Sequence, residues 1–270
     1  RNDNYYGKKA LSKKVVFRYI LDATALSNAI LSGQIDIMST VQKPELLSIF
    51  KNRKDLKVVS GTTNGEVTLG MNNSKAPLNN IKVRQAIRQA INKKALIKTA
   101  WAGYGLEIGS FVPPTDPWFE DLSKKSPFDV QAAKNLLKQA GYPNGFSIVL
   151  DIPPAPYAEA SQEFIAASLK TIGINVSIKP VAWGEWLDRI FTKANYDMTI
   201  VAHVERGDMS IYANPNYYFR YNNTEYQALI KKASSARTAA AQFSIRYRCG
   251  PAGHHNSRRP DGLGRLHSWA

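Results

Sequence analysis

The sequence predicts an α/β fold in which strands and helices alternate. Runs of β-branched and aromatic residues are separated by segments whose apolar residues recur at helical spacing, with Asp, Asn, Gly and Pro at the junctions. Elements of these lengths, in this alternation, are typical of a layer structure with helices packed on a sheet. The chain has 270 residues, of which 44% are hydrophobic and 21% charged, and this is enough material for a substantial core.

The first 60 residues predict a βαβ-like unit that is too short to cover a sheet on both faces. Asp22 is placed to cap a helix over residues 25–32, and Gly33 is placed to end it. The other expected elements are strands over 15–20, 35–38 and 56–59 and a helix over 44–50.

The segment from residue 66 to residue 236 predicts the larger part of the fold. Asp129 is a helix cap, Gly173 is a helix stop, and the prolines from 113 to 117 mark an irregular loop. Strands are expected over 66–71, 146–152, 174–180 and 196–203, and helices over 83–93, 93–100, 130–140, 157–172, 183–193 and 226–236.

Residues 243–270 differ in composition from the rest of the chain. They hold five Arg and no Lys, three of the four His, and the single cysteine, Cys249. We interpret this aberrant basic tail as out-of-frame translation or a foreign sequence; a genuine disordered basic tail is the alternative.

The formal net charge of +15 raises the question of nucleic-acid binding. Residues 1–100 hold 18 Lys and Arg against 6 Asp and Glu, but these are spread over helices and loops without a dense run. No zinc-finger spacing or aromatic-basic RNA signature accompanies them. The pattern therefore favours a solvated basic surface over a nucleic-acid interface.

Sequence patterns typical of catalysis are weak. The segment Gly103–Gly109 approaches the dinucleotide-binding pattern G-x-G-x-x-G, but its third glycine is displaced by one position and it follows a helix instead of a strand. No zinc-protease, nucleophile-elbow or P-loop pattern occurs, and His254 and His255 lack partner ligands at metal spacing. We expect neither catalytic residues nor a metal or cofactor.

Six segments, in this order, resemble the family-5 extracellular solute-binding proteins of ABC transporters, the group that includes dipeptide, oligopeptide, nickel and opine receptors. The segments are RNDNYYG at 1–7, DATA and GQID within 17–36, NNIKVRQAIRQAI at 79–91, AKNLLKQAGYPNGF at 133–146, LKTIGI at 169–174 and YDM at 196–198. The resemblance covers about residues 1–242. In the first segment, Asp3 and Tyr6 replace the family's Pro and Trp.

The resemblance implies a periplasmic-binding-protein-like type II fold with two lobes and mixed sheets flanked by helices. Residues 1–66 would be part of lobe I and residues 67–242 would be lobe II. The first segment falls near the middle of family members, so the N-terminal part of lobe I and the C-terminal closing segment are expected to lie outside this chain.

The same resemblance implies the solute-binding component of an ABC importer. It would be periplasmic, or extracellular and membrane-anchored, and monomeric. It would capture a peptide-like or other small polar ligand between its lobes and deliver it to the permease subunits. The alternatives are a basic nucleic-acid-binding protein and an α/β enzyme whose active site lies in the missing part.

Ligand contacts are implied first in the loop after the YDM strand, which resembles a family loop, WxxDxxDPxxF, whose Asp can take a ligand ammonium. The candidates are His203, Glu205, Arg206, Asp208, Tyr212 and Arg220. The charged residues could instead pair with one another at the surface. His203, which stands where Trp is usual, could be a satisfied buried histidine, and Arg220 could clamp a carboxylate or lie at the surface.

Four further residues are candidate ligand contacts. Asn72 and Asn73 could donate to a ligand or satisfy turn backbone. Trp101 and Trp183 could stack on a ligand, whereas Trp186, at helical spacing with Ile190, is expected in the core.

Overall fold

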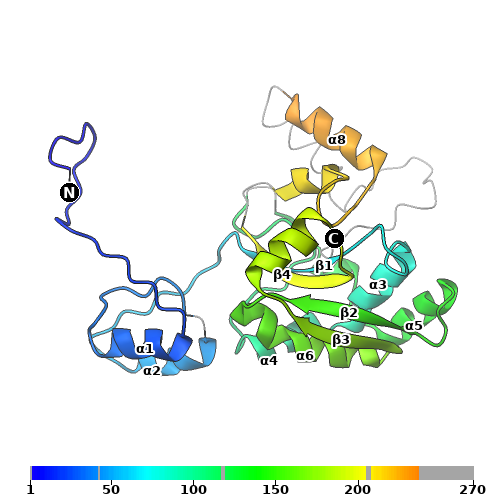
Figure 1. Cartoon of the computed structure of the whole chain (residues 1–270), viewed down its shortest axis with the longest axis horizontal. Coiled ribbons are helices and arrows are strands. Elements are labelled where there is room, and N and C mark those ends of the chain that lie inside the picture. Colours follow the sequence, from blue (N-terminus) through cyan, green and yellow to red (C-terminus); the bar gives the residue numbers. More distant parts are fainter. Residues whose placement is uncertain (1, 42, 117–118, 205–207, 237–270) are drawn as a thin grey trace. The chain divides into compact units, whose positions relative to one another are not determined.

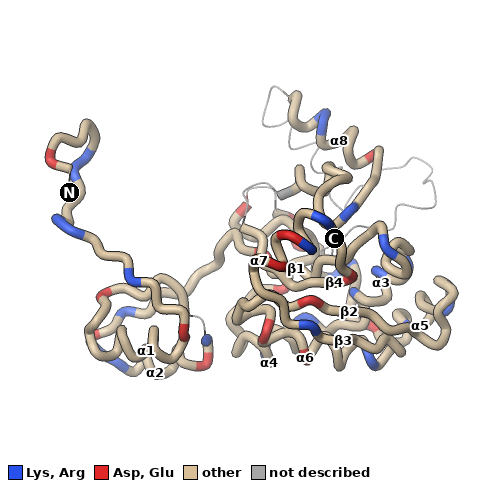
Figure 2. Tube along the Cα trace, in the orientation of Figure 1, with Lys and Arg blue, Asp and Glu red and all other residues tan. Residues whose placement is uncertain are grey.

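The computed structural model describes residues 2–41, 43–116, 119–204 and 208–236. These residues divide into two compact units, one ending at Val58 and the other beginning at Val59 (Figure 1). Lys and Arg occur along both units with Asp and Glu between them (Figure 2). The predicted tail, residues 243–270, lies outside the described residues.

The N-terminal unit is built on two short helices. Helix α1 (Ala23–Leu31) begins two residues earlier than predicted. Asp22 caps it as predicted, with its Oδ1 accepting from the amide of Ala25 at 2.7 Å, and the chain leaves the helix through Gly33 in the left-handed conformation (φ +72°). The second helical segment is a 3-10 turn, η1 (Pro44–Leu46), continued by α2 (Leu47–Lys51).

The three strands predicted for the N-terminal unit do not form. Among the described residues, segments 15–20, 35–38 and 56–59 have no strand partner, and Val15, Phe17 and Tyr19 are 67%, 81% and 93% exposed. A strand needs a neighbour for its main-chain hydrogen bonds and a surface to cover its apolar face. The prediction was wrong because β-propensity reports how well residues suit a sheet and does not report whether a sheet is present.

The C-terminal unit contains a mixed four-stranded sheet in the order β1-β4-β2-β3. Strand β1 (Glu66–Met71) pairs antiparallel with β4 (Met198–His203), with Glu66 opposite His203. Strand β2 (Phe146–Ile152) runs parallel to both β4 and β3 (Ile174–Pro180). The predicted bounds of β1, β2 and β3 are confirmed, and β4 begins two residues later than predicted.

Helices cover one face of this sheet and form an aliphatic core with it. They are α3 (Ile81–Ala90), α4 (Lys93–Ala100), α5 (Val130–Gln139) and α6 (Pro156–Lys170) (Figure 1). Asn80, Asn92 and Asp129 cap the first three of these helices through their side-chain oxygens. Met198 and Ile200 of β4 belong to this core.

The opposite face of the sheet carries an aromatic core. Val201 of β4 belongs to it together with Trp186, Tyr218 and Phe219, and Trp186 is buried as predicted. Because alternate residues of a strand point to opposite faces, β4 contributes to both cores. The remaining described elements are α7 (Trp183–Glu185), η3 (Trp186–Thr192), η4 (Asp208–Ala213), α8 (Thr224–Ser234) and the short turn η2 (Ser123–Lys125).

The helix predicted over 183–193 is α-helical only in its first turn and is π-helical in η3. The wider turn is held by polar contacts to the sheet. Trp186 Nε1 donates to Thr199 Oγ1 at 3.0 Å, and Arg189 donates to both carboxylate oxygens of the buried Asp151, at 2.6 and 3.2 Å. Tertiary contacts of this kind override the local 3.6-residue period that the sequence predicts.

Hydrogen bonds of the Asn72 side chain stabilise the crossover that follows β1. Its side-chain amide donates to the carbonyls of Ala194 and Tyr196 at 2.8 and 3.1 Å, and its Oδ1 accepts from the amide and the hydroxyl of Ser74. Asn73 donates to the carbonyls of Met71 and Phe219, each at 3.0 Å. Both side chains thus satisfy backbone groups of the turn, which the sequence analysis gave as the alternative to ligand binding. Contact of either residue with a ligand stays a prediction.

Substitution of Asn72 by Ala is expected to lower the free energy of unfolding by about 2–4 kcal/mol, because the buried carbonyl of Tyr196 and the half-buried carbonyl of Ala194 lose their donor. Urea unfolding of the whole chain measures this change. Asn79→Ala, an exposed position in the same loop, is the matched control and should change stability by less than about 0.5 kcal/mol. Equal effects at the two positions would contradict the role assigned to Asn72.

Two turns of the C-terminal unit meet at Gly145 and Gly173. Gly145 has φ +73°, and a side-chain carbon there would clash with the carbonyl of Gly173. Gly141 has φ +90° but nothing lies within 4 Å of the same position. Gly145 and Gly141 therefore share the left-handed conformation but differ in the space available for a side chain.

Gly145→Ala is expected to destabilise the C-terminal unit by more than about 3 kcal/mol, since conformational strain adds to the backbone clash. Gly141→Ala should cost only about 1 kcal/mol, the strain alone. Thermal unfolding of the two variants measures the difference, and a Gly145 variant as stable as the Gly141 variant would refute the close approach.

Candidate ligand-binding site

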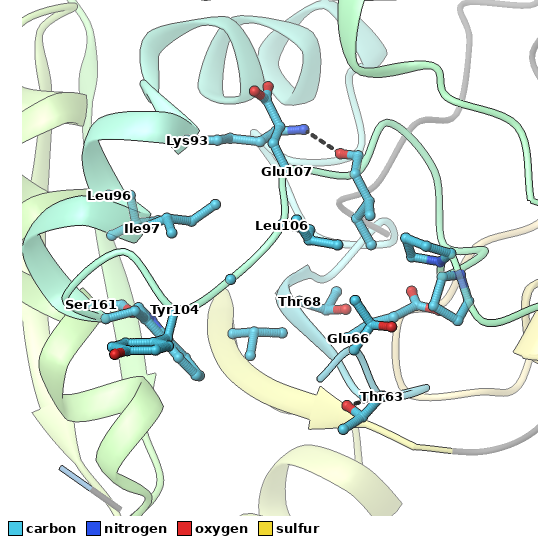
Figure 3. Close-up of a pocket in the computed structure, with 18 of the residues that line it drawn as sticks. Thr63, Glu66, Thr68, Lys93, Leu96, Ile97, Tyr104, Leu106, Glu107 and Ser161 are labelled. Carbon is cyan, nitrogen blue, oxygen red and sulfur yellow. Dashed lines mark hydrogen bonds between the residues drawn. The ribbon is translucent and has the colours of Figure 1, made fainter. Parts of the chain in front are cut away.

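A cavity of about 550 Å³ lies in the C-terminal unit. Its walls come from the segment 60–68 that leads into β1, from the segment 93–114 that includes α4 and the following loop, and from two residues of α6 and one each of β4 and η4 (Figure 3). A cavity of this volume suits a small-molecule ligand.

Aromatic rings form one part of the cavity wall. The ring of Trp101 stacks on Tyr157 with 6.3 Å between centroids, and its Nε1 donates to Ser161 Oγ at 3.4 Å. Phe111 stacks on Tyr212 at 4.4 Å, and Tyr212 in turn stacks on Phe219 of the aromatic core at 5.4 Å. These contacts hold the rings in place before any ligand arrives, which lowers the entropic cost of binding.

Charged side chains lie on two different sides of the cavity. Glu66, the first residue of β1, lines it and is buried. Lys93, the first residue of α4, and Glu107, in the loop after α4, also line it, and Figure 3 shows them together and apart from Glu66. Lys93 Nζ donates to the carbonyl of Ile108 at 2.9 Å.

Burial perturbs the basic groups at this side of the cavity. It lowers the pKa of Lys93 to about 8; the charge of Arg88 lowers it further and that of Glu107 opposes the change. Burial also lowers the pKa of Arg88 on α3 to about 10, again with Glu107 opposing. Titratable groups perturbed in this way cluster at functional sites.

Of the ten residues predicted to contact ligand, Trp101 and Tyr212 line this cavity. His203 and Arg220 do not line it. His203 is buried, with its Nε2 at 2.8 Å from the hydroxyl of Tyr218 and its ring stacked on that ring at 6.0 Å. Arg220 adopts φ +54° and donates to the carbonyl of Asn216 at 3.0 Å.

Three further predicted residues, Asn72, Asn73 and Trp183, do not line the cavity. Asn72 and Asn73 are in the crossover described above, and Trp183 is 41% exposed, with its ring against Trp186 at 5.7 Å. Glu205 and Arg206 lie outside the described residues, and Asp208 begins η4. Ligand contact by any of these residues stays a prediction.

Sequence reasoning missed Glu66, Lys93, Tyr104 and Glu107, which all line the cavity. Glu66 and Lys93 stand at the first positions of a strand and a helix, where a charged residue carries no special signal. One feature of the sequence could have indicated this part of the cavity, namely the glycine-rich segment Gly103–Gly109, which the sequence analysis set aside as an imperfect nucleotide-binding pattern. Glycine residues in a loop allow the backbone to come close to a cavity.

Among the described residues, no three His, Cys, Asp or Glu side chains are grouped so that they could hold a metal ion. Within the same residues, no helix has the length and apolar character needed to cross a membrane.

Comparison with solved structures identifies the fold. A dipeptide-binding protein from Pseudoalteromonas in complex with Met-Leu superposes with a TM-score of 0.75 and 26% identity, over 84% of this chain and 48% of the other. An ABC transporter-associated periplasmic binding protein from Helicobacter pylori, in complex with the peptide STSA, superposes with a TM-score of 0.80 and 26% identity, over 92% and 50%. The fold is a partial periplasmic-binding-protein type II fold, and the predicted fold class is confirmed.

Comparison of sequences gives the same assignment. Heme-binding protein A of Haemophilus influenzae is 29% identical over 86% of this chain and 45% of its own length, and the dipeptide-binding protein of Escherichia coli is 31% identical over 69% and 36%. This chain therefore spans less than half the length of these relatives. The family model for bacterial extracellular solute-binding proteins, family 5 middle, matches residues 1–228. The resemblance seen in the sequence is confirmed: the chain belongs to the family-5 bacterial extracellular solute-binding proteins.

Proposed function

We propose that this chain is part of the solute-binding component of an ABC importer, with residues 67–242 as lobe II. The cavity, lined by Lys93 and Trp101 of this segment and by Glu66 directly before it, would form one half of the site for a peptide-like or other small polar ligand. The single observation that supports this most is a preformed cavity with aromatic walls and separated charges, in a chain of this family.

The mechanism we propose is closure of two lobes on the ligand, followed by docking to the permease outside the cytoplasmic membrane. Closure buries the ligand and strengthens its polar contacts by excluding water. Lobe II alone presents only part of the contact surface, so this chain by itself should bind in the millimolar range.

The alternative functions have less support. The relatives are named as heme-binding and dipeptide-binding proteins, and one similar solved structure as an ABC transporter-associated binding protein, which disfavours an enzyme whose active site lies elsewhere. Basic residues are interleaved with acidic ones along the trace, which disfavours a nucleic-acid interface (Figure 2). Steeply salt-dependent binding to DNA would reverse this preference.

The proposal predicts that di- and tripeptides, Met-Leu among them, shift the indole N–H resonance of Trp101 in the NMR spectrum. Trp101→Phe assigns the resonance. The indole of Trp183, which is exposed and outside the cavity, is the internal control and should not shift. The absence of a Trp101 shift across a peptide and opine panel, or equal shifts of both indoles, would contradict the proposed site.

Isothermal titration of the same chain tests the two-lobe mechanism separately. We expect no measurable heat in the micromolar range, because one lobe supplies only part of the contact surface. Sub-micromolar binding by this chain alone would show that a single lobe is sufficient and would refute the mechanism.

A further inference from the structure

We propose that Tyr157, which does not line the cavity, is a positioning residue for ligand binding, because it ties the indole of Trp101, part of the cavity wall, to the end of strand β4. This inference rests on the proposed function, since it adds a residue outside the cavity to the site proposed there. It is supported by the contacts of one side chain with two separate parts of the C-terminal unit.

The hydroxyl of Tyr157 holds the end of β4. The pairing of β2 with β4 covers only Met198 and Thr199 of β4. Three residues beyond Thr199, the amide of Ala202 donates to the Tyr157 hydroxyl at 3.1 Å. A strand amide needs a partner of this kind once the neighbouring strand has ended. Tyr157, in the first turn of α6, therefore fixes this helix to the strand.

The ring of Tyr157 supports the indole of Trp101. The two rings stack with 6.3 Å between their centroids and 22° between their planes. Ser161, one helical turn after Tyr157, is buried, and its Oγ accepts from Trp101 Nε1 at 3.4 Å and donates to the Tyr157 carbonyl at 2.7 Å. Helix α6 thus holds the indole by stacking and by a hydrogen bond. Figure 3 shows Ser161 on the same side of the cavity as Ile97 and Tyr104.

The backbone that carries Trp101 is strained. Trp101 is the C-cap of α4, and its amide donates to the carbonyl of Ile97 at 3.1 Å. The next residue, Ala102, has φ +49°, a left-handed conformation that alanine rarely adopts, and Gly103 follows with φ +82°. Such strain persists only where surrounding contacts determine the conformation, and it is common at ligand sites. The contacts of the indole with α6 supply that constraint.

Tyr157 therefore joins two parts of the proposed site. Trp101 lines the cavity, and β4 leads through His203 into the loop where the sequence predicts further ligand contacts. A ring that is fixed before the ligand arrives loses little conformational freedom on binding, so its contacts contribute more to affinity. Loss of the Tyr157 hydroxyl should loosen the indole and thereby weaken binding.

The experiment compares Tyr157→Phe with the wild-type chain, without ligand and with Met-Leu. Phenylalanine keeps the stack and removes the acceptor of the Ala202 amide. In the free chain, ¹⁵N relaxation should show a more mobile Trp101 indole, whereas the indole of Trp186, which donates to Thr199 on the same strand, should not change. Affinity for Met-Leu, followed through the methyl resonances of the peptide, should fall by about threefold to tenfold, the effect of one hydrogen bond.

Two controls separate positioning from a general loss of stability. Tyr142→Phe, at a half-buried tyrosine outside the cavity whose ring packs on Phe146, should leave the affinity and both indoles unchanged. In a chain carrying Trp101→Ala, Tyr157→Phe should change the affinity by less than about twofold, because the ring to be positioned is absent. An equal loss of affinity with and without Trp101, or equal loosening of the Trp101 and Trp186 indoles, would give Tyr157 a structural role only and overturn the proposal.

The outcomes distinguish this inference from the proposed function. If Met-Leu binds the wild-type chain and Tyr157→Phe with equal affinity, the proposed function stands and Tyr157 is not a positioning residue. If neither Met-Leu nor any other peptide or opine shifts the Trp101 indole of the wild-type chain, the proposed function fails. The inference then fails with it, whatever the mobility of the indole.

Discussion

The antiparallel pairing of β1 with β4 is the constraint on which the rest of the C-terminal unit depends. It joins residues more than 120 positions apart in the chain and sets Glu66 opposite His203. Because β4 also pairs with β2, the same strand carries the aliphatic core on one face and the aromatic core on the other. A register shift of one residue would exchange the two faces of β4 and disrupt both cores at once.

The cavity is a consequence of this pairing. The segment leading into β1 forms one wall, and η4, which follows β4 in the chain, contributes Tyr212 to another. Tyr212 stacks on Phe219 of the aromatic core, so packing on that face of the sheet orients a ring at the cavity. Stability of the core and preorganisation of the site thus have the same origin.

In the described part of the N-terminal unit, by contrast, the predicted strands lack the kind of partner that β1 has in β4. Residues 15–20 of this unit have the composition of a strand, yet Val15, Phe17 and Tyr19 are exposed, and no strand lies beside the segment among the described residues. Secondary structure in a sheet is a property of at least two segments, whereas a helix satisfies its own backbone. The helix α1 therefore forms in this unit while the predicted strands do not.

The sequence by itself determined the family, the α/β class, and nearly all elements of the C-terminal unit, because caps, glycine stops and apolar periodicity are local signals. It also indicated that Trp186 lies in the core and that Trp101 and Tyr212 are candidates for the site. Only the tertiary structure decided the strand order, the π-helical turn of η3, and the grouping of Glu66, Lys93 and Glu107 around one cavity. These features depend on pairings between residues distant in the chain, and no local pattern encodes which distant side chains share a cavity or how much water their burial removes.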